Sequence, residues 1–184
     1  MYGVLADIIS TDDAYLKAVE TALFSNLQDI MVDSPDAARD GAVFLAGGKR
    51  GRAVFVPLDG DAELVGDPLP AEDGVLGFAS DFVRTEERFQ PVVRRYLRNC
   101  VVVDTADTAL RLHKMFPRFD FAAVTGEMVC ANGDIHGGSG TKDSVNSSIG
   151  RMEKYKLRSS ELSEAEKLVE QFTDKKRKLI ADTE

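Results

Sequence analysis

Tryptophan is absent from this sequence, and cysteine and histidine occur only twice each. The cysteines, Cys100 and Cys130, stand beside apolar residues, which is typical of small buried side chains in a reducing cytosol; a disulfide between them is the less favoured alternative. No Cys-x-x-Cys pair is present, and His113 and His136 form no His-x-x-x-His pair. The sequence therefore predicts no metal site, and we expect no cofactor in this chain.

Long apolar runs are missing as well. The longest candidates, such as residues 101–103, have the length of a strand, whereas a membrane helix needs about 20 apolar residues. No charged segment followed by an apolar run opens the chain, so a signal peptide is not indicated. We expect a water-soluble globular protein with no membrane partner, built as one domain or as two small subdomains that share a core.

Basic residues are missing between Pro57 and Gly74, although the whole chain has 23 basic and 31 acidic residues and a net charge of -8. Blocks of like charge usually face water, so this segment predicts a solvated acidic loop more than an acidic binding site. Overall acidity argues only weakly against an anionic partner, because local patches decide such contacts. The acidic residues of the segment are Asp59, Asp61, Glu63, Asp67, Glu72 and Asp73.

The most informative feature that is present is an internal repeat. Residues 7–15 (DIISTDDAY) are echoed by residues 81–89 (DFVRTEERF). Later positions correspond at nearly the same offset: Val19 and Val93, Leu23 and Leu97, and residues 30–34 and 101–105. The repeat predicts two related subdomains joined by the acidic loop.

Each copy is predicted to follow the order strand, helix, strand, helix, strand, which defines a mixed α/β fold. Thr11 and Ser34 in the first copy, and Thr85 and Thr105 in the second, are predicted helix N-caps. The predicted strands are short runs rich in β-branched residues: 4–9, 30–32 and 53–56 in the first copy, and 101–103 and 121–124 in the second.

Only the second copy of the repeat is followed by further predicted elements. Residues 125–131 are predicted to form a further strand or hairpin, the glycine-rich run 131–142 (ANGDIHGGSGTK) follows, and the chain is predicted to be helical from Ser144 onward. Apolar residues in this tail repeat at three- and four-residue steps, as in a coiled-coil seam that needs a partner helix: Ala165, Leu168, Phe172 and Leu179. No matching helix precedes Tyr2, so we expect that partner in a longer parent chain.

Two motifs resemble functional elements but lack the residues that the chemistry needs. Residues 46–51 (AGGKRG) differ from a phosphate-binding loop, because Val43 replaces its first glycine and Arg50 replaces its magnesium-binding hydroxyl. Ser139 lies between glycines, but there is no Gly-x-Ser-x-Gly motif and no evident histidine partner. We therefore predict a tight turn at residues 46–51 and no enzymatic activity of this chain.

Basic residues gather in three places. The first and third groups are each typical of a solvated helix face paired with nearby acids. The second and third groups together could also present cations on one face, as contact with phosphates requires, and are candidates for nucleic-acid binding. The groups are Arg88, Arg94, Arg95 and Arg98 on the helix around Pro91; Lys49, Arg50 and Arg52, here called the cationic knob; and Arg151, Lys154, Lys156 and Arg158 at the start of the tail.

Seven short segments of the sequence, taken in the order in which they occur, resemble the hinge domain of SMC (structural maintenance of chromosomes) proteins of the bacterial type. The resemblance implies two α/β subdomains that pair head to tail in a homodimer and join antiparallel coiled-coil arms. It also implies a parent protein that condenses and segregates chromosomes on the nucleoid in the cytoplasm, with ATP-binding heads that lie outside this chain. The segments that carry the resemblance are residues 3–9, 18–23, 51–58, 77–83, 101–104, 124–129 and 137–139.

The resemblance divides the chain into subdomain I (residues 1–58), the acidic linker (59–75), subdomain II (76–143) and the root of the arm (144–184). It implies a glycine-rich contact between the two hinges and contact with DNA near the arm root. The implied dimer residues are Gly133, His136, Gly137, Gly138, Ser139 and Gly140. The implied DNA-contact residues are Lys49, Arg50, Arg52, Lys142, Arg151 and Lys154.

One function of another class is left open: an α/β enzyme or small-molecule-binding domain that uses the cleft between the subdomains. No set of residues with a defined chemical role supports this alternative.

Overall fold

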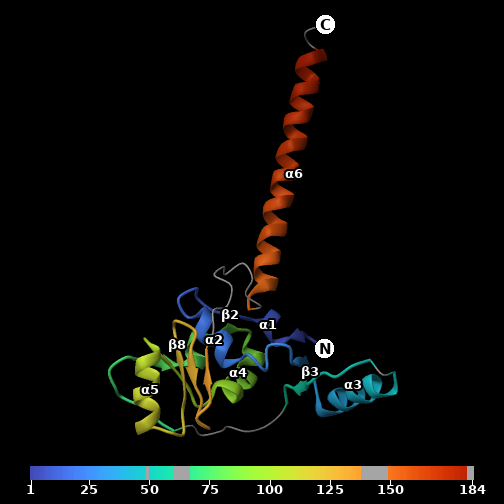
Figure 1. Ribbon diagram of the computed structural model, residues 1–184. Coiled ribbons are helices and arrows are strands. Elements are labelled where there is room, and N and C mark those ends of the chain that lie inside the picture. The colour runs from blue at the N-terminus through green and yellow to red at the C-terminus, as the bar shows by residue number, and fades with distance from the viewer. Residues whose placement is uncertain (49, 60–66, 138–148, 182–184) are drawn as a thin grey trace. The chain divides into compact units, whose positions relative to one another are not determined.

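The computed structural model describes residues 1–48, 50–59, 67–137 and 149–181. It divides the chain into two compact units, Met1–Gly150 and Arg151–Glu184. The first unit contains the sheets, and the second contains one long helix, α6 (Arg151–Ala181) (Figure 1). The predicted mixed α/β class is confirmed. None of the helices in the described ranges has the length and apolar character that crossing a membrane requires.

Subdomain I is built around a three-stranded sheet. β1 (Gly3–Val4) pairs antiparallel with β3 (Ile30–Val32), which pairs parallel with β4 (Phe55–Pro57). α3 (Pro35–Gly47) connects the two parallel strands. The strand order is β1-β3-β4.

Subdomain II repeats this arrangement. β5 (Val75–Phe78) pairs antiparallel with β7 (Cys100–Val103), which pairs parallel with β8 (Asp120–Ala123), and α5 (Ala106–Met115) connects the parallel strands. A hairpin of β9 (Met128–Val129) and β10 (Ile135–His136) extends the sheet to the order β10-β9-β8-β7-β5. The same pairing pattern in both sheets shows that the sequence repeat is structural.

The two copies meet at a short ladder. β2 (Ile9–Ser10) pairs antiparallel with β6 (Arg84–Thr85), and Ser10 lies opposite Arg84. The offset that relates Asp7 to Asp81 also relates Ser10 to Arg84, so each of these two residues pairs with its own repeat equivalent. Such self-pairing is what a local two-fold axis produces. The first unit is thus a pseudo-symmetric pair of related halves.

The predicted strand at residues 4–9 is wrong, because the helical turn α1 (Leu5–Ile8) interrupts it. The Leu5 N–H donates to the Asp29 carbonyl at 2.9 Å, the Ala6 N–H donates to the Leu27 carbonyl at 3.0 Å, and both side chains are fully buried. The turn carries the chain from the first sheet to the β2–β6 ladder. A 3-10 turn, η1 (Ala79–Phe82), stands at the equivalent place in subdomain II.

Two of the four predicted N-caps are confirmed. The hydroxyl of Ser34 accepts from the Ala37 N–H at 3.3 Å, and that of Thr105 accepts from the Thr108 N–H at 3.2 Å.

Thr11 and Thr85 are not caps. α2 (Leu16–Ala22) begins after Tyr15 without a side-chain cap, and α4 (Gln90–Leu97) follows a 3-10 turn, η2 (Glu87–Phe89). Thr85 lies in β6 instead and donates to the Ile8 carbonyl at 2.7 Å. At Thr85 the strand pairing between the subdomains has taken the place of helix capping, whereas the buried hydroxyl of Thr11 has no hydrogen-bond partner among the described residues.

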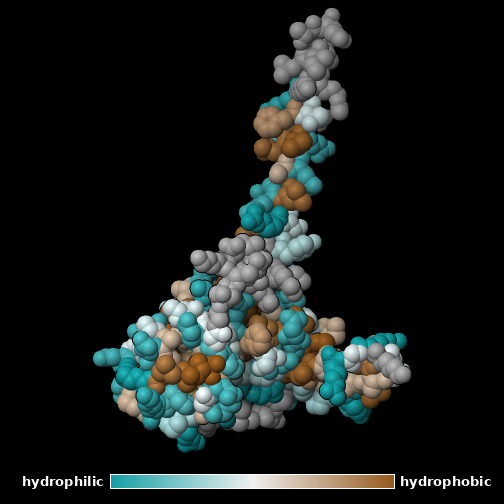
Figure 2. Space-filling view, viewed as in Figure 1, coloured by the Kyte–Doolittle hydropathy of each residue, from teal (hydrophilic) through white to brown (hydrophobic). Residues whose placement is uncertain are grey.

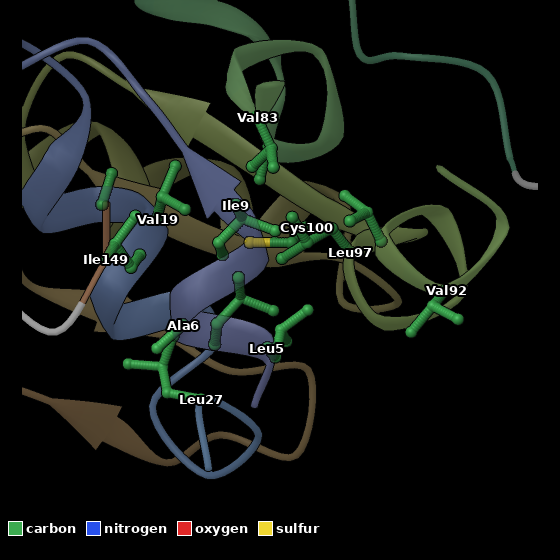
Figure 3. Close-up of a cluster of buried hydrophobic side chains, with 14 of the residues drawn as sticks. Leu5, Ala6, Ile9, Val19, Leu27, Val83, Val92, Leu97, Cys100 and Ile149 are labelled. Atoms are coloured by element: carbon green, nitrogen blue, oxygen red, sulfur yellow. The ribbon is translucent and has the colours of Figure 1, made fainter. Parts of the chain in front are cut away.

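The main hydrophobic core is shared by both subdomains (Figure 3). Ile149, just before α6, is also buried in it, at 2% exposure, and the adjacent Gly150 N–H donates to the Ala6 carbonyl at 3.2 Å. Because the core is joint, we expect the two copies to unfold together. Its members in Figure 3 include Leu5, Ala6, Ile9, Val19 and Leu27 from subdomain I, and Val83, Val92, Leu97 and Cys100 from subdomain II.

Subdomain II has a second cluster of buried side chains, which includes Ala109 and Leu112 of α5. Subdomain I has no equivalent, because no residue of α3 is buried. α3 approaches β4 through Gly41, where an added Cβ would lie 2.7 Å from the ring of Phe55. The helix therefore packs by close backbone approach and leaves its larger apolar side chains at the surface.

A buried carboxylate links the two subdomains. Asp29, only 4% exposed, precedes β3 and accepts hydrogen bonds from the Tyr96 hydroxyl of α4 at 2.7 Å and from the Asn26 amide at 3.0 Å. Burial and this carboxylate raise the pKa of Tyr96 well above its usual range, so the phenol stays a donor.

Tyr96→Phe is expected to lower the free energy of unfolding by about 1.5–3 kcal/mol, because hydrogen bonds to charged groups contribute that much. Tyr155→Phe is the matched control, since Tyr155 is 68% exposed on α6 and its replacement should leave stability unchanged. Urea titration of both variants measures the difference. Equal stability of the two would show that the Asp29–Tyr96 contact contributes nothing.

Candidate functional site

The predicted dimer edge begins in the β9–β10 hairpin. Gly133 lies in the exposed turn of the hairpin with a φ of +90°, a conformation that favours glycine, and its N–H donates to the Cys130 carbonyl at 2.8 Å. His136 is exposed in β10, and Gly137 directly after it is exposed too. β10 is the last strand of its sheet, so its outer backbone groups have no strand partner in the described part of the chain.

The other predicted edge residues, Gly138, Ser139 and Gly140, lie outside the described residues, as does the predicted boundary at residue 144. The structure thus places the first three of the six predicted dimer residues on or beside an open sheet edge. Of the further strand or hairpin expected over residues 125–131, the strand is confirmed as β9; the second strand of its hairpin lies outside that range, at Ile135 and His136.

A second open edge lies on β4 of subdomain I. Its equivalent by the repeat is β8, and the outer edge of β8 is covered by β9. Subdomain I has no counterpart of the β9–β10 hairpin, and within the described ranges β4 pairs only with β3. Among the residues that the structure describes, one copy of the repeat therefore lacks the strand that completes the other.

Large apolar side chains are exposed near both open edges. Val54, directly before β4, is 57% exposed, and Ile135 in β10 is 63% exposed. Val43 and Phe44 on the adjacent α3 are 64% and 61% exposed. Apolar side chains on the part of the surface that holds β3 and α3 are visible in Figure 2. The sequence did not lead us to predict these four residues as interface residues. The signal that could have indicated the open edge was a repeat in which only one copy continues into a hairpin.

The cationic knob is only partly described, because Lys49 lies outside the described residues, as does Lys142. Arg50 and Arg52 are exposed on the turn after α3, and the Arg50 guanidinium lies 4.1 Å from the centroid of the Phe44 ring. Arg151 and Lys154 open α6, but their side chains are not among those described. Of the predicted DNA-contact residues, the structure describes the side chains of Arg50 and Arg52 alone, and both are exposed.

The interpretation of Arg88, Arg94, Arg95 and Arg98 as a helix face paired with acids is wrong for three of the four residues, as far as the described carboxylates show. Arg88 does pair with Glu86. Arg94, Arg95 and Arg98 have no ion pair with any described carboxylate, because the acidic residues of this segment, Glu86 and Glu87, lie before the helix.

Neither cysteine forms a disulfide. Cys100 is fully enclosed, and burial raises the pKa of its thiol above the usual range. Cys130 lies half-buried with its Sγ 3.8 Å from Nε2 of His136, and burial beside Asp120 raises its pKa too. Within the residues searched, 1–48, 50–59, 67–137 and 149–181, no group of three or more metal-binding side chains comes together.

Comparison with protein families identifies a match over residues 1–113 to the model of the SMC proteins' flexible hinge domain. The chromosome partition protein Smc of Fusobacterium nucleatum is 32% identical over 155 residues, which cover 84% of this chain and 13% of that protein. The corresponding protein of Lactiplantibacillus plantarum is 34% identical over 151 residues, or 77% of this chain and 12% of that protein. The chain thus spans about an eighth of the length of these curated relatives.

Solved structures of SMC hinge domains are also similar to this chain. An asymmetric dimer of the Geobacillus stearothermophilus SMC hinge domain superposes with a TM-score of 0.73 at 26% identity, covering 91% of this chain and 69% of that one. The Pyrococcus furiosus SMC hinge domain gives a TM-score of 0.62 at 25% identity and covers 79% of each chain. These matches favour a hinge over an enzyme or small-molecule binder in the cleft. From its repeat, its fold and these relatives, the chain belongs to the family of SMC flexible hinge domains.

Proposed function

We propose that this hinge dimerises by completing the unfinished sheet of subdomain I with an edge from its partner. The single observation that carries the proposal is the outer edge of β4, which no described strand covers, whereas its repeat equivalent β8 is covered by a hairpin. Addition of a strand to an open edge gives main-chain hydrogen bonds, and the side chains beside it give specificity. The partner's β10 and the glycine-rich run after it supply the complementary edge.

A two-fold dimer of this kind contains the contact twice. Subdomain I of each copy receives subdomain II of the other, which closes the pair and leaves no free complementary edge. The exposed Val54 and Ile135 would become buried at each contact, together with Phe44 of α3. Glycines such as Gly137 suit this edge because a close backbone approach leaves no room for side chains.

The unit formed by α6 supports a second part of the proposal, that the hinge joins coiled-coil arms. The predicted seam residues Ala165, Leu168 and Phe172 are exposed on α6 and recur at three- and four-residue steps. This is the a and d pattern of a coiled coil, and it requires a partner helix. We infer that the partner is an antiparallel arm of the parent protein.

At the level of the whole protein, we propose an SMC chromosome-partition protein in the cytoplasm, associated with the nucleoid. ATP hydrolysis would belong to head domains joined to the hinge by its arms, so the hinge itself needs no cofactor. DNA contact by the cationic knob and the arm root is part of the same proposal; it is supported by the exposure of Arg50 and Arg52.

A cross-linking experiment tests the proposed contact directly. In a Cys130→Ser background, Val54→Cys and Ile135→Cys in the same chain should give covalent dimers with a short bismaleimide, because the two positions face each other across the interface. Denaturing electrophoresis measures the product. Cys100 is fully buried and contributes no background.

Each single cysteine variant is the matched control and should give little covalent dimer, since Val54 is predicted to face Ile135 of the partner and not its own equivalent. Leu110→Cys, at a 40% exposed position of α5, is a control for random collision. Cross-linking of the double variant no stronger than that of Leu110→Cys would argue against the β4–β10 contact.

A further inference from the structure

The open edge of β4 contains a proline. The Ile30 N–H of β3 donates to the Val54 carbonyl at 2.8 Å, and the Leu58 N–H donates back to β3 at 3.0 Å. Because the backbone groups of a strand alternate in direction, those of Phe55 and Pro57 face away from β3, towards the open edge. Proline has no N–H, and it is tolerated in a sheet at such an edge. Within β4, the Phe55 N–H is therefore the one donor that faces outward.

The equivalent position in subdomain II holds the hairpin that covers β8. Pro57 lies opposite Val32 in the parallel ladder of subdomain I. Ala123 lies opposite Val103, the repeat equivalent of Val32, in the ladder of subdomain II. The Ala123 N–H donates to the Glu127 carbonyl at 2.7 Å, just before β9. Pro57 cannot make this bond, so the edge of β4 cannot be covered in the way that β8 is.

The outer edge of β10 offers groups that match those of Phe55. The Cys130 N–H donates to the Asp134 carbonyl at 2.8 Å, so the Asp134 carbonyl faces β9. By the alternation of the ladder, His136 faces β9 as well, and Ile135 between them faces outward. β10 consists of Ile135 and His136. The strand thus presents one outward N–H and one outward carbonyl, and Phe55 presents one of each.

We propose that Pro57 selects the strand that binds this edge: it admits a strand as short as β10 and fixes its register, with the carbonyl of Ile135 of the partner subunit bound to the Phe55 N–H. The inference rests on the dimer contact proposed above and adds the residue that makes the contact specific. Whichever way the partner's strand runs, a shift of two residues towards Pro57 leaves that carbonyl without a donor.

A longer strand is disfavoured for the same reason. Its next carbonyl on the side facing β4 would lie beside Pro57 whenever the first carbonyl is bound to Phe55. A carbonyl that loses water in an interface without gaining a donor lowers the affinity. The edge therefore accepts the short β10 and discriminates against the extended strands with which an open sheet edge would otherwise pair.

Pro57→Ala supplies the missing donor and is expected to tighten the dimer about tenfold, because a two-fold dimer contains the contact twice and gains two hydrogen bonds. Pro57→Val should have a similar effect, since the gain comes from the N–H and not from the side chain. The N–H of position 57 faces away from β3, so neither substitution removes a bond of the sheet. Fluorescence-detected sedimentation over a dilution series measures the dissociation constant.

Amide hydrogen exchange, followed by NMR, reports which donors are engaged. The Phe55 N–H should exchange at least about tenfold more slowly in the unmodified dimer than in a Val54→Glu and Ile135→Glu variant, for which we expect a monomer. In Pro57→Ala, the new N–H of position 57 should show the same difference when the two glutamates are added. Pro117→Ala, at an exposed proline after α5, is the matched control and should change neither the affinity nor the exchange of Phe55.

The outcomes separate the role of Pro57 from the dimer contact itself. A monomeric unmodified chain, or equal exchange of the Phe55 N–H in the dimer and in the glutamate variant, would remove both proposals. A protected Phe55 N–H together with an unchanged dissociation constant in Pro57→Ala, and no protection at position 57, would overturn the role of Pro57 alone. Tighter dimers in Pro57→Ala and Pro57→Val, but not in Pro117→Ala, support that role.

Discussion

A chain that carries Val54→Glu and Ile135→Glu is expected to sediment as a folded monomer under conditions in which the unmodified chain is a dimer. Full burial of an aliphatic side chain contributes about 1.5–3 kcal/mol, and each of the two positions occurs twice in a two-fold dimer. Even partial burial of the four side chains amounts to about 4 kcal/mol, or a 1000-fold change in affinity. The new carboxylates add a cost, because they would be desolvated without a partner.

The control for this experiment introduces the same two charges at another exposed apolar place. Leu110 and Met115 on α5 are 40% and 47% exposed, and Leu110→Glu with Met115→Glu should leave the dimer intact. Circular dichroism of both variants checks that the fold is kept. If the β4–β10 variant stays dimeric, or if the α5 variant dissociates equally, the interface lies elsewhere.

The second large effect is expected in the shared core. Leu97 of α4 is fully buried where the two subdomains meet (Figure 3), and Leu97→Ala should lower the free energy of unfolding by about 2.7–5 kcal/mol, as buried leucine truncations do. Leu110→Ala, at a half-exposed position of α5, should cost much less. Urea denaturation in the monomeric background separates these losses from the concentration dependence of a dimer.

The shape of the unfolding curve carries further information. Because residues of both copies form one core, Met1–Gly150 should unfold in one cooperative transition, and Leu97→Ala should shift the whole transition. Two separate transitions, with Leu97→Ala moving only one of them, would mean that the subdomains are independent.

The sequence predicted the fold class because its repeat carries the pattern twice. Residues 30–32 and 101–103 are apolar runs in both copies, and Ser34 and Thr105 cap the helices that follow, so local chemistry decided these elements. The helical turn at Leu5–Ile8 could not be predicted in the same way. It exists because the chain must pass from one sheet to the β2–β6 ladder, which is a tertiary requirement.

The candidate site was predictable in part. Glycines and His136 indicated an edge near residues 131–142, and β10 is such an edge. The matching edge on β4 was hidden, because Val54 and Phe44 have the apolar character of core residues, and only the structure shows that no residue of α3 is buried. The α4 arginines were misinterpreted for a similar reason: an ion pair depends on which carboxylates the fold brings near.

The most direct test of the central claim is the mass of the unmodified chain in solution. Sedimentation equilibrium at tens of micromolar should give twice the 20.1 kDa of one chain, and the Val54→Glu and Ile135→Glu variant should give a single chain mass. A single chain mass for the unmodified protein at that concentration would contradict the account.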